Sequence, residues 1–245
     1  MRIVTGELTS AGGRQANQDR VGVTRNGELA CCLLADGLGG HGGGERAAEL
    51  ALGAIDQAFR AYAEFSPEAL RTYLEAANRV VEQGQRESPQ LAAMRTTLVM
   101  LLLSGGEALW AHVGDSRLYH FQRGRIALRT KDHSVPQAMA DAGQIEDTQI
   151  RFHEDRNRLL KSLGGKSDIG VSIVTEPRKL SAGDAFLLAS DGLWEHVNEL
   201  EMEAELAKAD SPAAWLAGLE LRLLQRAQAD HDNYSAVAVM VEEGV

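Results

Sequence analysis

Short apolar runs that end at glycine, asparagine or aspartate recur along the chain. The run from Ala30 to Ala35 has the length and bulk of a buried strand, and it ends at Asp36. Asn26 and Gly27, just before it, form a strong hairpin signal. Further strands are predicted within residues 1–25 (two short ones) and at 96–103, 108–113, 118–121, 185–189 and 234–241. Consecutive hairpins of this kind indicate an antiparallel sheet rather than a parallel one.

Helical periodicity marks three longer stretches. Apolar residues recur at helical spacing from residue 45 to about residue 65. A second helix is expected after Ser66, a typical N-cap that Pro67 follows, and it should stop between residues 84 and 89. A third helix is expected after Ser211, with Pro212 in its first turn.

Residues 131–170 are the least regular part of the chain. They are polar and charged, and we interpret them as a surface flap with short helices at 135–142 and near 157–162. No linker-like stretch rich in proline and serine, and no internal repeat, divides the sequence. A chain of 245 residues is long enough to bury a sizeable core, so we expect a single domain that spans residues 1–245.

The charge balance is acidic, with 35 Asp and Glu residues against 25 Lys and Arg and a net charge of −10. This balance argues against nucleic acids or anionic membranes as partners. No apolar run approaches the roughly 20 residues that span a bilayer, and the N-terminus lacks the apolar segment of a signal peptide. The two cysteines, Cys31 and Cys32, are neighbours in one strand and point to opposite faces, so they suit a core in the reducing cytoplasm.

Six glycines lie within residues 37–44, directly after Asp36. Their spacing matches a dinucleotide-binding loop, but Asp36 would repel a pyrophosphate, and a second helix follows where that unit needs a strand. The loop also lacks the alternating oxygen donors of an EF-hand. Residues 165–167 end like a Walker A loop, but Leu160 stands in place of its first glycine. A flexible loop with one chance aspartate stays open as an interpretation of this stretch alone.

An aspartate adjoins a predicted strand at five places, namely Asp19, Asp36, Asp115, Asp191 and Asp232. Each one alone is typical of a turn, but strands that end on one edge would bring the five carboxylates together. Two carboxylates about 4 Å apart repel by about 4 kcal/mol at an effective dielectric of roughly 20, so such a cluster needs a cation. Hard oxygen donors suit Mg²⁺ or Mn²⁺, and a pair of these ions can activate water for attack at phosphorus.

Arg14 lies just upstream of Asp19. Its guanidinium could bind phosphoryl oxygens, or it could be a solvated surface group. With the acids, it belongs to a set of motifs that resembles the protein phosphatase 2C family of metal-dependent serine/threonine phosphatases, in its compact bacterial form. In family order the motifs are Arg14-x-x-Asn17-Gln18-Asp19, Asp36-Gly37-x-Gly39-Gly40-His41, Thr96-Thr97, Val113-Gly114-Asp115-Ser116-Arg117, Asp132-His133-Ser134, Ser190-Asp191-Gly192-Leu193-Trp194 and Asp232-Asn233.

The resemblance implies an α+β fold with four layers, α-β-β-α, in which two antiparallel sheets are flanked by helices. It implies a cleft at one end of the sandwich that holds two metal ions, Mn²⁺ or Mg²⁺. By motif match, Asp36 would bridge the two ions, and the carbonyl of Gly37 would contact one of them. Asp191 and Asp232 would complete the second site.

Further roles follow from the same resemblance. Asp19 would belong to the metal site and help to orient metal-bound water, and Arg14 would bind the phosphate. Asp115 matches the position that supplies a third, weaker metal site in bacterial members. The irregular stretch from about residue 134 to 165 matches their flap, which is linked to substrate choice.

Three positions depart from the family pattern. Gln18 stands where the family usually has glutamate, so a charge that would favour metal binding is missing. Arg95 stands where a glycine usually precedes the two threonines. Leu38 occupies the place of a histidine proposed in members from higher organisms as the acid for the leaving group, and His41 lies three residues further on. Water or His41 could protonate the leaving alkoxide.

The sequence therefore predicts a cytoplasmic phosphatase that hydrolyses phosphoserine and phosphothreonine in proteins. We expect phosphorylated proteins as its substrates, an opposing serine/threonine kinase, a monomeric state, and neither nucleic acid nor membrane as a partner. Two alternatives stay open. Gln18 and Arg95 would also suit a non-catalytic phosphoprotein-binding regulator on the same fold, and a small-molecule phosphatase would share the chemistry.

Overall fold

The computed structural model describes residues 1–40, 42–165 and 170–244. Its strands form two antiparallel sheets. The five-stranded sheet has the order β1 (Arg2–Ser10), β12 (Tyr234–Glu242), β11 (Ala185–Ala189), β7 (Arg117–Gln122) and β8 (Arg125–Arg129). The seven-stranded sheet has the order β10 (Arg178–Lys179), β6 (Glu107–Val113), β5 (Leu98–Ser104), β3 (Leu29–Leu38) and β2 (Asp19–Asn26), with β4 (Arg95–Thr96) beside β3 and β9 (Ser172–Ile173) beside β6.

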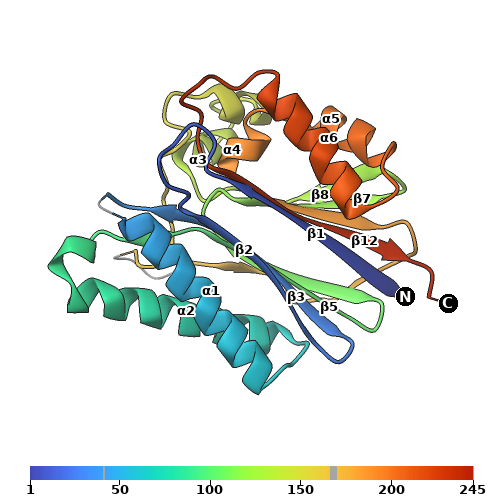
Figure 1. The fold of residues 1–245 in the computed structure, drawn as a ribbon, viewed down its shortest axis with the longest axis horizontal. Helices are drawn as coiled ribbons and strands as arrows, with labels where there is room; N and C mark the ends of the chain where they lie inside the picture. The colour runs from blue at the N-terminus through green and yellow to red at the C-terminus, as the bar shows by residue number, and fades with distance from the viewer. Residues whose placement is uncertain (41, 166–169, 245) are drawn as a thin grey trace.

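Helices cover the outer faces of both sheets. In Figure 1, α1 and α2 lie against the seven-stranded sheet, and α5 and α6 lie against the five-stranded sheet. The helices are α1 (Gly43–Ala61), α2 (Pro67–Glu87), α3 (Val135–Asp141), α4 (Asp191–Trp194), α5 (Glu199–Leu206) and α6 (Pro212–Leu224), with 3-10 turns η1 (Pro89–Leu91) and η2 (Asp147–Phe152). The predicted α+β sandwich with four layers, α-β-β-α, is confirmed.

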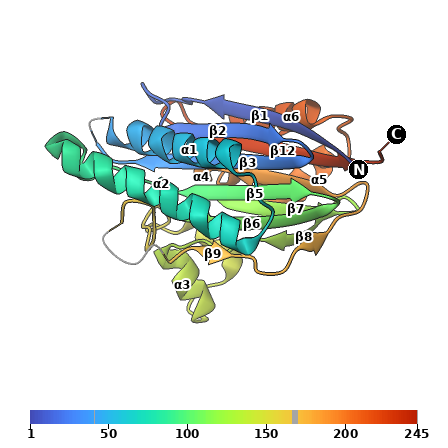
Figure 2. The same cartoon turned by 90° about the horizontal axis from the view of Figure 1, so that it is seen from below.

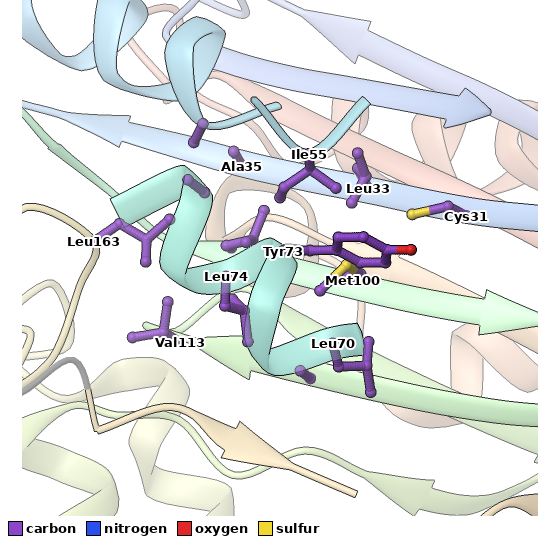
Figure 3. Close-up of a cluster of buried hydrophobic side chains, with 14 of the residues drawn as sticks. Cys31, Leu33, Ala35, Ile55, Leu70, Tyr73, Leu74, Met100, Val113 and Leu163 are labelled. Atoms are coloured by element: carbon purple, nitrogen blue, oxygen red, sulfur yellow. The ribbon is translucent and has the colours of Figure 1, made fainter. Parts of the chain in front are cut away.

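Three apolar clusters hold the layers together. One lies between the two sheets and includes Leu34, Val99 and Phe186. A second lies between α1, α2 and the seven-stranded sheet, where Ile55 and Tyr73 pack over the strands (Figure 3). The third lies under α4, α5 and α6. Each cluster buries the face of a sheet that would otherwise be exposed, which is the main stabilising contribution in such a sandwich.

Local sequence signals set several boundaries as predicted. Gly27 adopts a φ of +60° in the turn between β2 and β3, which glycine accepts without strain. The hydroxyl of Ser66 accepts a hydrogen bond from the amide of Ala69 and caps α2. Ser211 caps α6 in the same way through the amide of Ala214. Both caps satisfy amides that have no partner within their own helix.

The short helix expected near residues 157–162 is wrong. Val135 to Asp141 is helical as predicted, but the next helical turn is η2, at Asp147–Phe152. Around Leu160 the chain is extended instead, because its amide donates to the carbonyl of His133 at 2.8 Å. Ser134 and Leu159 form an isolated antiparallel bridge beside this bond. Pairing with the start of the flap therefore replaces the local helical preference.

The run of hairpins is interrupted at the turn that follows β6. β5 and β6 form a hairpin, and so do β7 and β8, but β6 and β7 belong to different sheets. Residues 114–116 therefore carry the chain from one layer to the other. The strand predicted at 96–103 is also divided, into β4 and β5, with Thr97 between them.

The two ends of the sandwich differ. Figure 1 shows both chain termini at one end and the start of α1 at the other. Figure 2 shows α3 beyond the edge of the seven-stranded sheet, on the side of β9. None of the helices in the described part of the chain is long and apolar enough to cross a bilayer.

Candidate active site

The five predicted acids lie at the ends of different strands. Asp19 is the first residue of β2, and it faces Asp36 of β3 in the register of that pair. Asp115 follows β6, Asp191 begins α4 just after β11, and Asp232 precedes β12. Residues from both sheets, more than 200 positions apart in the sequence, are thus brought to one end of the sandwich.

A pocket of about 230 Å³ collects these acids. Its lining residues are Gln18, Asp36, Gly37, Leu38, Gly39, Asp115, Asn157, Asp191, Asp232 and Asn233. Asp19 is 1 % exposed and lies beside Asp36, beneath the pocket. The structure therefore brings together all the acids that the sequence singled out. We call this group the carboxylate pocket.

Burial and mutual repulsion dominate the electrostatics of the carboxylate pocket. Burial, together with the charges of the neighbouring acids, raises the pKa of Asp36 and of Asp191 well above the usual range. Burial and the charge of Asp132 raise the pKa of Asp115 to about 7. Burial raises the pKa of Asp19 to about 6, although Ser235 and Ser190 lower it. The ionised forms are thus destabilised, which is the condition that a bound cation would relieve.

The donor set fits hard divalent cations. One carboxylate oxygen of Asp19, Oδ1, is buried and has no hydrogen-bond partner among the described residues. Among the same residues, no group of three or more His, Cys, Asp or Glu side chains is already arranged as a metal-binding set. Mg²⁺ keeps several of its waters and needs only one or two carboxylates. A pocket with few carboxylates and room for water therefore suits such an ion.

Gly37 lines the carboxylate pocket and packs closely against the first turn of α1. A Cβ at Gly37 would lie 2.1 Å from the carbonyl oxygen of Gly44, in the first turn of α1. A Cβ at Gly44 would likewise meet Gly37, at 2.6 Å. Only glycine at both positions lets the helix start this close to the strand end. The glycine-rich stretch is therefore a packing requirement at the site as well as a turn.

Two threonines hold the backbone of Asp36. The amide of Asp36 donates to Thr97 Oγ1 at 3.0 Å, and the hydroxyl of Thr96 donates to the Asp36 carbonyl at 2.9 Å. Thr97 Oγ1 also lies 2.7 Å from the hydroxyl of Ser116, next to Asp115. The threonine pair thus links the Asp36 strand to the Asp115 turn. This explains why one threonine ends β4 and the next lies between β4 and β5.

Arg14 lies at the rim of the pocket. One of its Nη atoms donates to Asp232 Oδ2 at 3.2 Å, and its side chain is 55 % exposed. Since a guanidinium has five N–H donors, most of them are left for a ligand. Arg14 is expected from the sequence either to bind phosphoryl oxygens or to be a solvated surface group, and its position at the pocket favours the first interpretation.

Gln18 has a role that a glutamate could not fill. Its side-chain amide donates to the carbonyl of Gly39 at 3.3 Å, and its backbone carbonyl accepts from the amide of Gly37 at 3.2 Å. A carboxylate has no proton to donate to Gly39. Arg95, the second departure, is an exposed residue paired with Leu38 across β4 and β3. Its side chain lies outside the pocket. His41 lies outside the described residues.

Sequence reasoning placed Asn233 and Ser190 in motifs but assigned neither of them a role in holding the acids. Asn233 accepts from the amide of Gln18 at 2.8 Å and donates to the carbonyls of Ala11 and Ala16 at 2.8 and 2.9 Å. It thereby ties the Arg14 loop to the end of β12. Ser190 donates to Asp19 Oδ2 at 2.9 Å. Both stand beside a predicted aspartate, and that adjacency is the signal that could have identified them.

The flap contributes to the site through Asn157, which lines the carboxylate pocket. Beside it, Arg156 bonds to Glu195 at 2.7 Å. Glu195 also lines a separate cavity of about 930 Å³ between η2 and the start of α5, with Arg151 and Phe152 among its other walls. That larger cavity contains none of the five predicted acids. The chemistry is therefore assigned to the smaller pocket.

Comparisons with known proteins agree with this geometry. Residues 10–226 match the family model for protein phosphatase 2C. The chain is 32 % identical over 196 residues to the serine/threonine phosphatase stp of Listeria welshimeri, covering 78 % of this chain and 77 % of that protein. It is 33 % identical over 215 residues to the protein phosphatase PhpP of Streptococcus pneumoniae, covering 84 % and 85 %.

A solved structure extends the comparison to a metal-loaded site. The catalytic domain of the serine/threonine protein phosphatase PstP, in complex with two manganese ions, matches with a TM-score of 0.83 and 26 % identity, covering 98 % of this chain and 99 % of that one. The motifs from Arg14 to Trp194 fall within the family-model match, which ends before Asp232 and β12. The chain belongs to the protein phosphatase 2C family.

Proposed function

We propose that the chain hydrolyses phosphoserine and phosphothreonine in proteins at the carboxylate pocket, with two Mn²⁺ or Mg²⁺ ions. It is a protein serine/threonine phosphatase by family and by the names of its relatives. The observation that supports the proposed site best is the convergence of acids at one end of the sandwich, where like charges and burial raise the pKa of Asp36 and of Asp191. Buried carboxylates without a cation would be costly to keep.

Particular residues would hold the ions. Asp36, with the Gly37 carbonyl, and the pair Asp191 and Asp232 supply oxygen donors that line one pocket. Asp115, at the same pocket, is the proposed ligand of a third and weaker site. When bound, two such ions acidify a water and stabilise negative charge on the phosphoryl group.

The chain's own groups position the substrate and the water. Arg14, at the rim, would bind phosphoryl oxygens with N–H groups that Asp232 does not use. Asp19 would accept a hydrogen bond from the attacking water at Oδ1, which has no partner among the described residues. Ser190 fixes the other oxygen of Asp19. A solvent water would protonate the leaving serine or threonine alkoxide.

The test of the proposed function is metal-dependent turnover. The purified protein is assayed with an aryl phosphate, a phosphothreonine peptide and a phosphorylated metabolite, with and without Mn²⁺. We expect hydrolysis only with the metal, and faster hydrolysis of the peptide than of the metabolite. Phosphopeptide binding without turnover by folded protein would instead support the non-catalytic regulator.

The finer assignments are also proposals. We propose that the enzyme acts as a monomer and opposes a serine/threonine kinase, since phosphoprotein substrates require such an enzyme. Both cysteines are buried free thiols, Cys31 under the helices and Cys32 between the sheets. This placement supports a reducing compartment such as the cytoplasm.

A further inference from the structure

Two hydrogen bonds join His133, at the start of the flap, to Gly114, the residue before Asp115. The amide of Gly114 donates to His133 Nδ1 at 3.2 Å, and the amide of His133 donates to the Gly114 carbonyl at 2.8 Å. On the other side of the ring, Nε2 lies 3.0 Å from the hydroxyl of Ser172 in β9. We call the bonds among His133, Gly114 and Ser172 the flap-root clasp.

The flap-root clasp requires one tautomer of the ring. A backbone amide can only donate, so Nδ1 of His133 is unprotonated where it accepts from Gly114. The neutral ring then carries its proton on Nε2, which donates to Ser172. Burial, followed by the charges of His112 and Lys161, lowers the pKa of His133 to about 3. His112 also stacks on the ring, with centroids 4.8 Å apart and planes within 8° of parallel.

The turn that the flap-root clasp holds is closely packed and places one carboxylate beside another. Gly114 has a φ of +100°, and a Cβ there would lie 2.6 Å from Cγ2 of Thr97. Asp115, the next residue, is buried near Asp191, and their charges repel. Trp194 Nε1 donates to the Asp115 carbonyl at 3.0 Å and holds the turn from one side. The flap-root clasp holds it from the other.

The same histidine meets the returning segment of the flap. The amide of Leu160 donates to the carbonyl of His133 at 2.8 Å. The backbone of this one residue therefore bonds both to the Asp115 turn and to the end of the flap. Ser172, beyond the flap, adds a third connection through the ring.

We propose that His133 is a positioning residue for Asp115. Through the Gly114 amide it fixes the carboxylate assigned to the third metal site, and it connects that carboxylate to the flap. The assignment of Asp115 to a metal site rests on the proposed function, but the bond from Gly114 to His133 Nδ1 does not.

Two variants separate the two sides of the ring. In His133→Asn the side-chain oxygen can take the place of Nδ1 as the acceptor for Gly114, whereas in His133→Gln the longer amide can reach only toward Ser172. We expect His133→Asn to stay within about threefold of the wild-type kcat. His133→Gln should lower kcat about tenfold and raise the Mn²⁺ concentration needed for half-maximal rate, with KM for a phosphothreonine peptide unchanged. Ser172→Ala removes only the bond to Nε2, so it should lower kcat less than His133→Gln does.

A readout that does not need turnover is amide exchange in metal-free protein. We expect the Gly114 amide to be protected in the wild type and in His133→Asn, and to exchange faster in His133→Gln. Equal protection and equal kinetics in the two variants would overturn the proposal.

A third measurement uses the wild type alone and so does not depend on whether a variant folds. Nitrogen-15 NMR of the His133 ring should show an unprotonated Nδ1 and a protonated Nε2, and a proton on Nδ1 would overturn the proposal. If the wild type shows no metal-dependent turnover, the proposed function fails, while amide exchange and the ring tautomer still decide the role of His133.

Discussion

Two regions of the molecule bury aspartates, and they neutralise them differently. Asp132 is buried against Arg117, which donates to both of its carboxylate oxygens at 2.8 and 2.7 Å. The guanidinium also lies 3.5 Å from the ring centroid of Trp194. In the carboxylate pocket, Asp36 and Asp191 are partly buried among like charges. In the first region the charge of the aspartate is neutralised by an arginine of the same chain. In the second region neutralisation needs a bound cation.

The comparison separates stability from function. A buried ion pair that is broken on one side leaves an uncompensated charge, so its residues matter for folding. Carboxylates that repel one another cost stability in the metal-free protein, so their presence is explained by what they bind. Substitutions in the two regions should therefore have opposite effects on stability.

The largest effect is expected from Asp36→Asn. It removes a proposed metal donor from the centre of the carboxylate pocket, so turnover of a phosphothreonine peptide should fall by at least about a thousandfold, or about 4 kcal/mol. The fold should remain, since one repelling charge is lost. Steady-state kinetics with Mn²⁺ and a thermal melt check both points, with exposed Asp210→Asn as the matched control. Activity close to that of the control would show that Asp36 is not a required metal ligand.

Arg117→Met tests the buried ion pair between Arg117 and Asp132. It leaves Asp132 buried without its partner, and we expect a loss of about 3–5 kcal/mol in the free energy of unfolding. Arg46→Met is the control, because it breaks an exposed pair with Glu49 on α1 and should cost about 0–1 kcal/mol. Denaturant unfolding at pH 7.5 measures both variants. Equal losses would show that the buried pair is not structurally important.

Asp115→Asn tests whether the ionised carboxyl of Asp115 destabilises the metal-free protein as pH rises. The pKa of Asp115 is raised to about 7 from an ordinary 3.8. The favourable contribution of its protonated form is therefore full below pH 3.8 and is lost as pH rises through 7. In chelator, the variant should be more stable than the wild type at pH 8, by at most on the order of 4 kcal/mol.

The same variant should lose its advantage as pH falls. Near pH 4 the wild-type carboxyl is protonated, so the two proteins should unfold at similar denaturant concentrations. With Mn²⁺, Asp115→Asn should lower kcat more than it raises KM. A variant less stable than the wild type at pH 8 in chelator would mean that another group already neutralises Asp115.

The smallest effect is expected from Arg14→Lys. The lysine keeps the positive charge at the rim but loses the planar fork that can hold two phosphoryl oxygens. We expect KM for the phosphopeptide to rise about tenfold, with little change in stability, since the side chain is 55 % exposed. An unchanged KM in the kinetic assay would show that Arg14 is a solvated surface residue that does not bind the phosphate.

Local patterns predict most of the helices and strands and the acids for a physical reason, whereas the four layers follow from the family resemblance. Apolar runs and capping residues such as Ser66 and Ser211 are local signals, and the structure confirms them. The recurrence of aspartate at strand ends is also visible along the chain. Which strands share a sheet is not a local property, so the sequence pattern predicts consecutive hairpins where the structure crosses between the sheets at residues 114–116.

The remaining errors have the same origin. The segment near Leu160 is extended because it pairs with His133, a partner 27 positions away that no local pattern shows. The roles of Asn233 and Ser190 depend on loops that meet only in the folded protein. Likewise, Arg117 and Asp132 both stand in recognised motifs, but their ion pair does not follow from either motif alone.

The most direct test of the account is a crystal structure of the protein soaked with Mn²⁺, with the ions located by their anomalous scattering. We predict two strong peaks in the carboxylate pocket, within about 2.3 Å of oxygens from Asp36, Asp191 and Asp232. Peaks elsewhere, or a pocket without any peak in protein that had been exposed to millimolar metal, would contradict the claim that these acids are gathered to bind divalent ions.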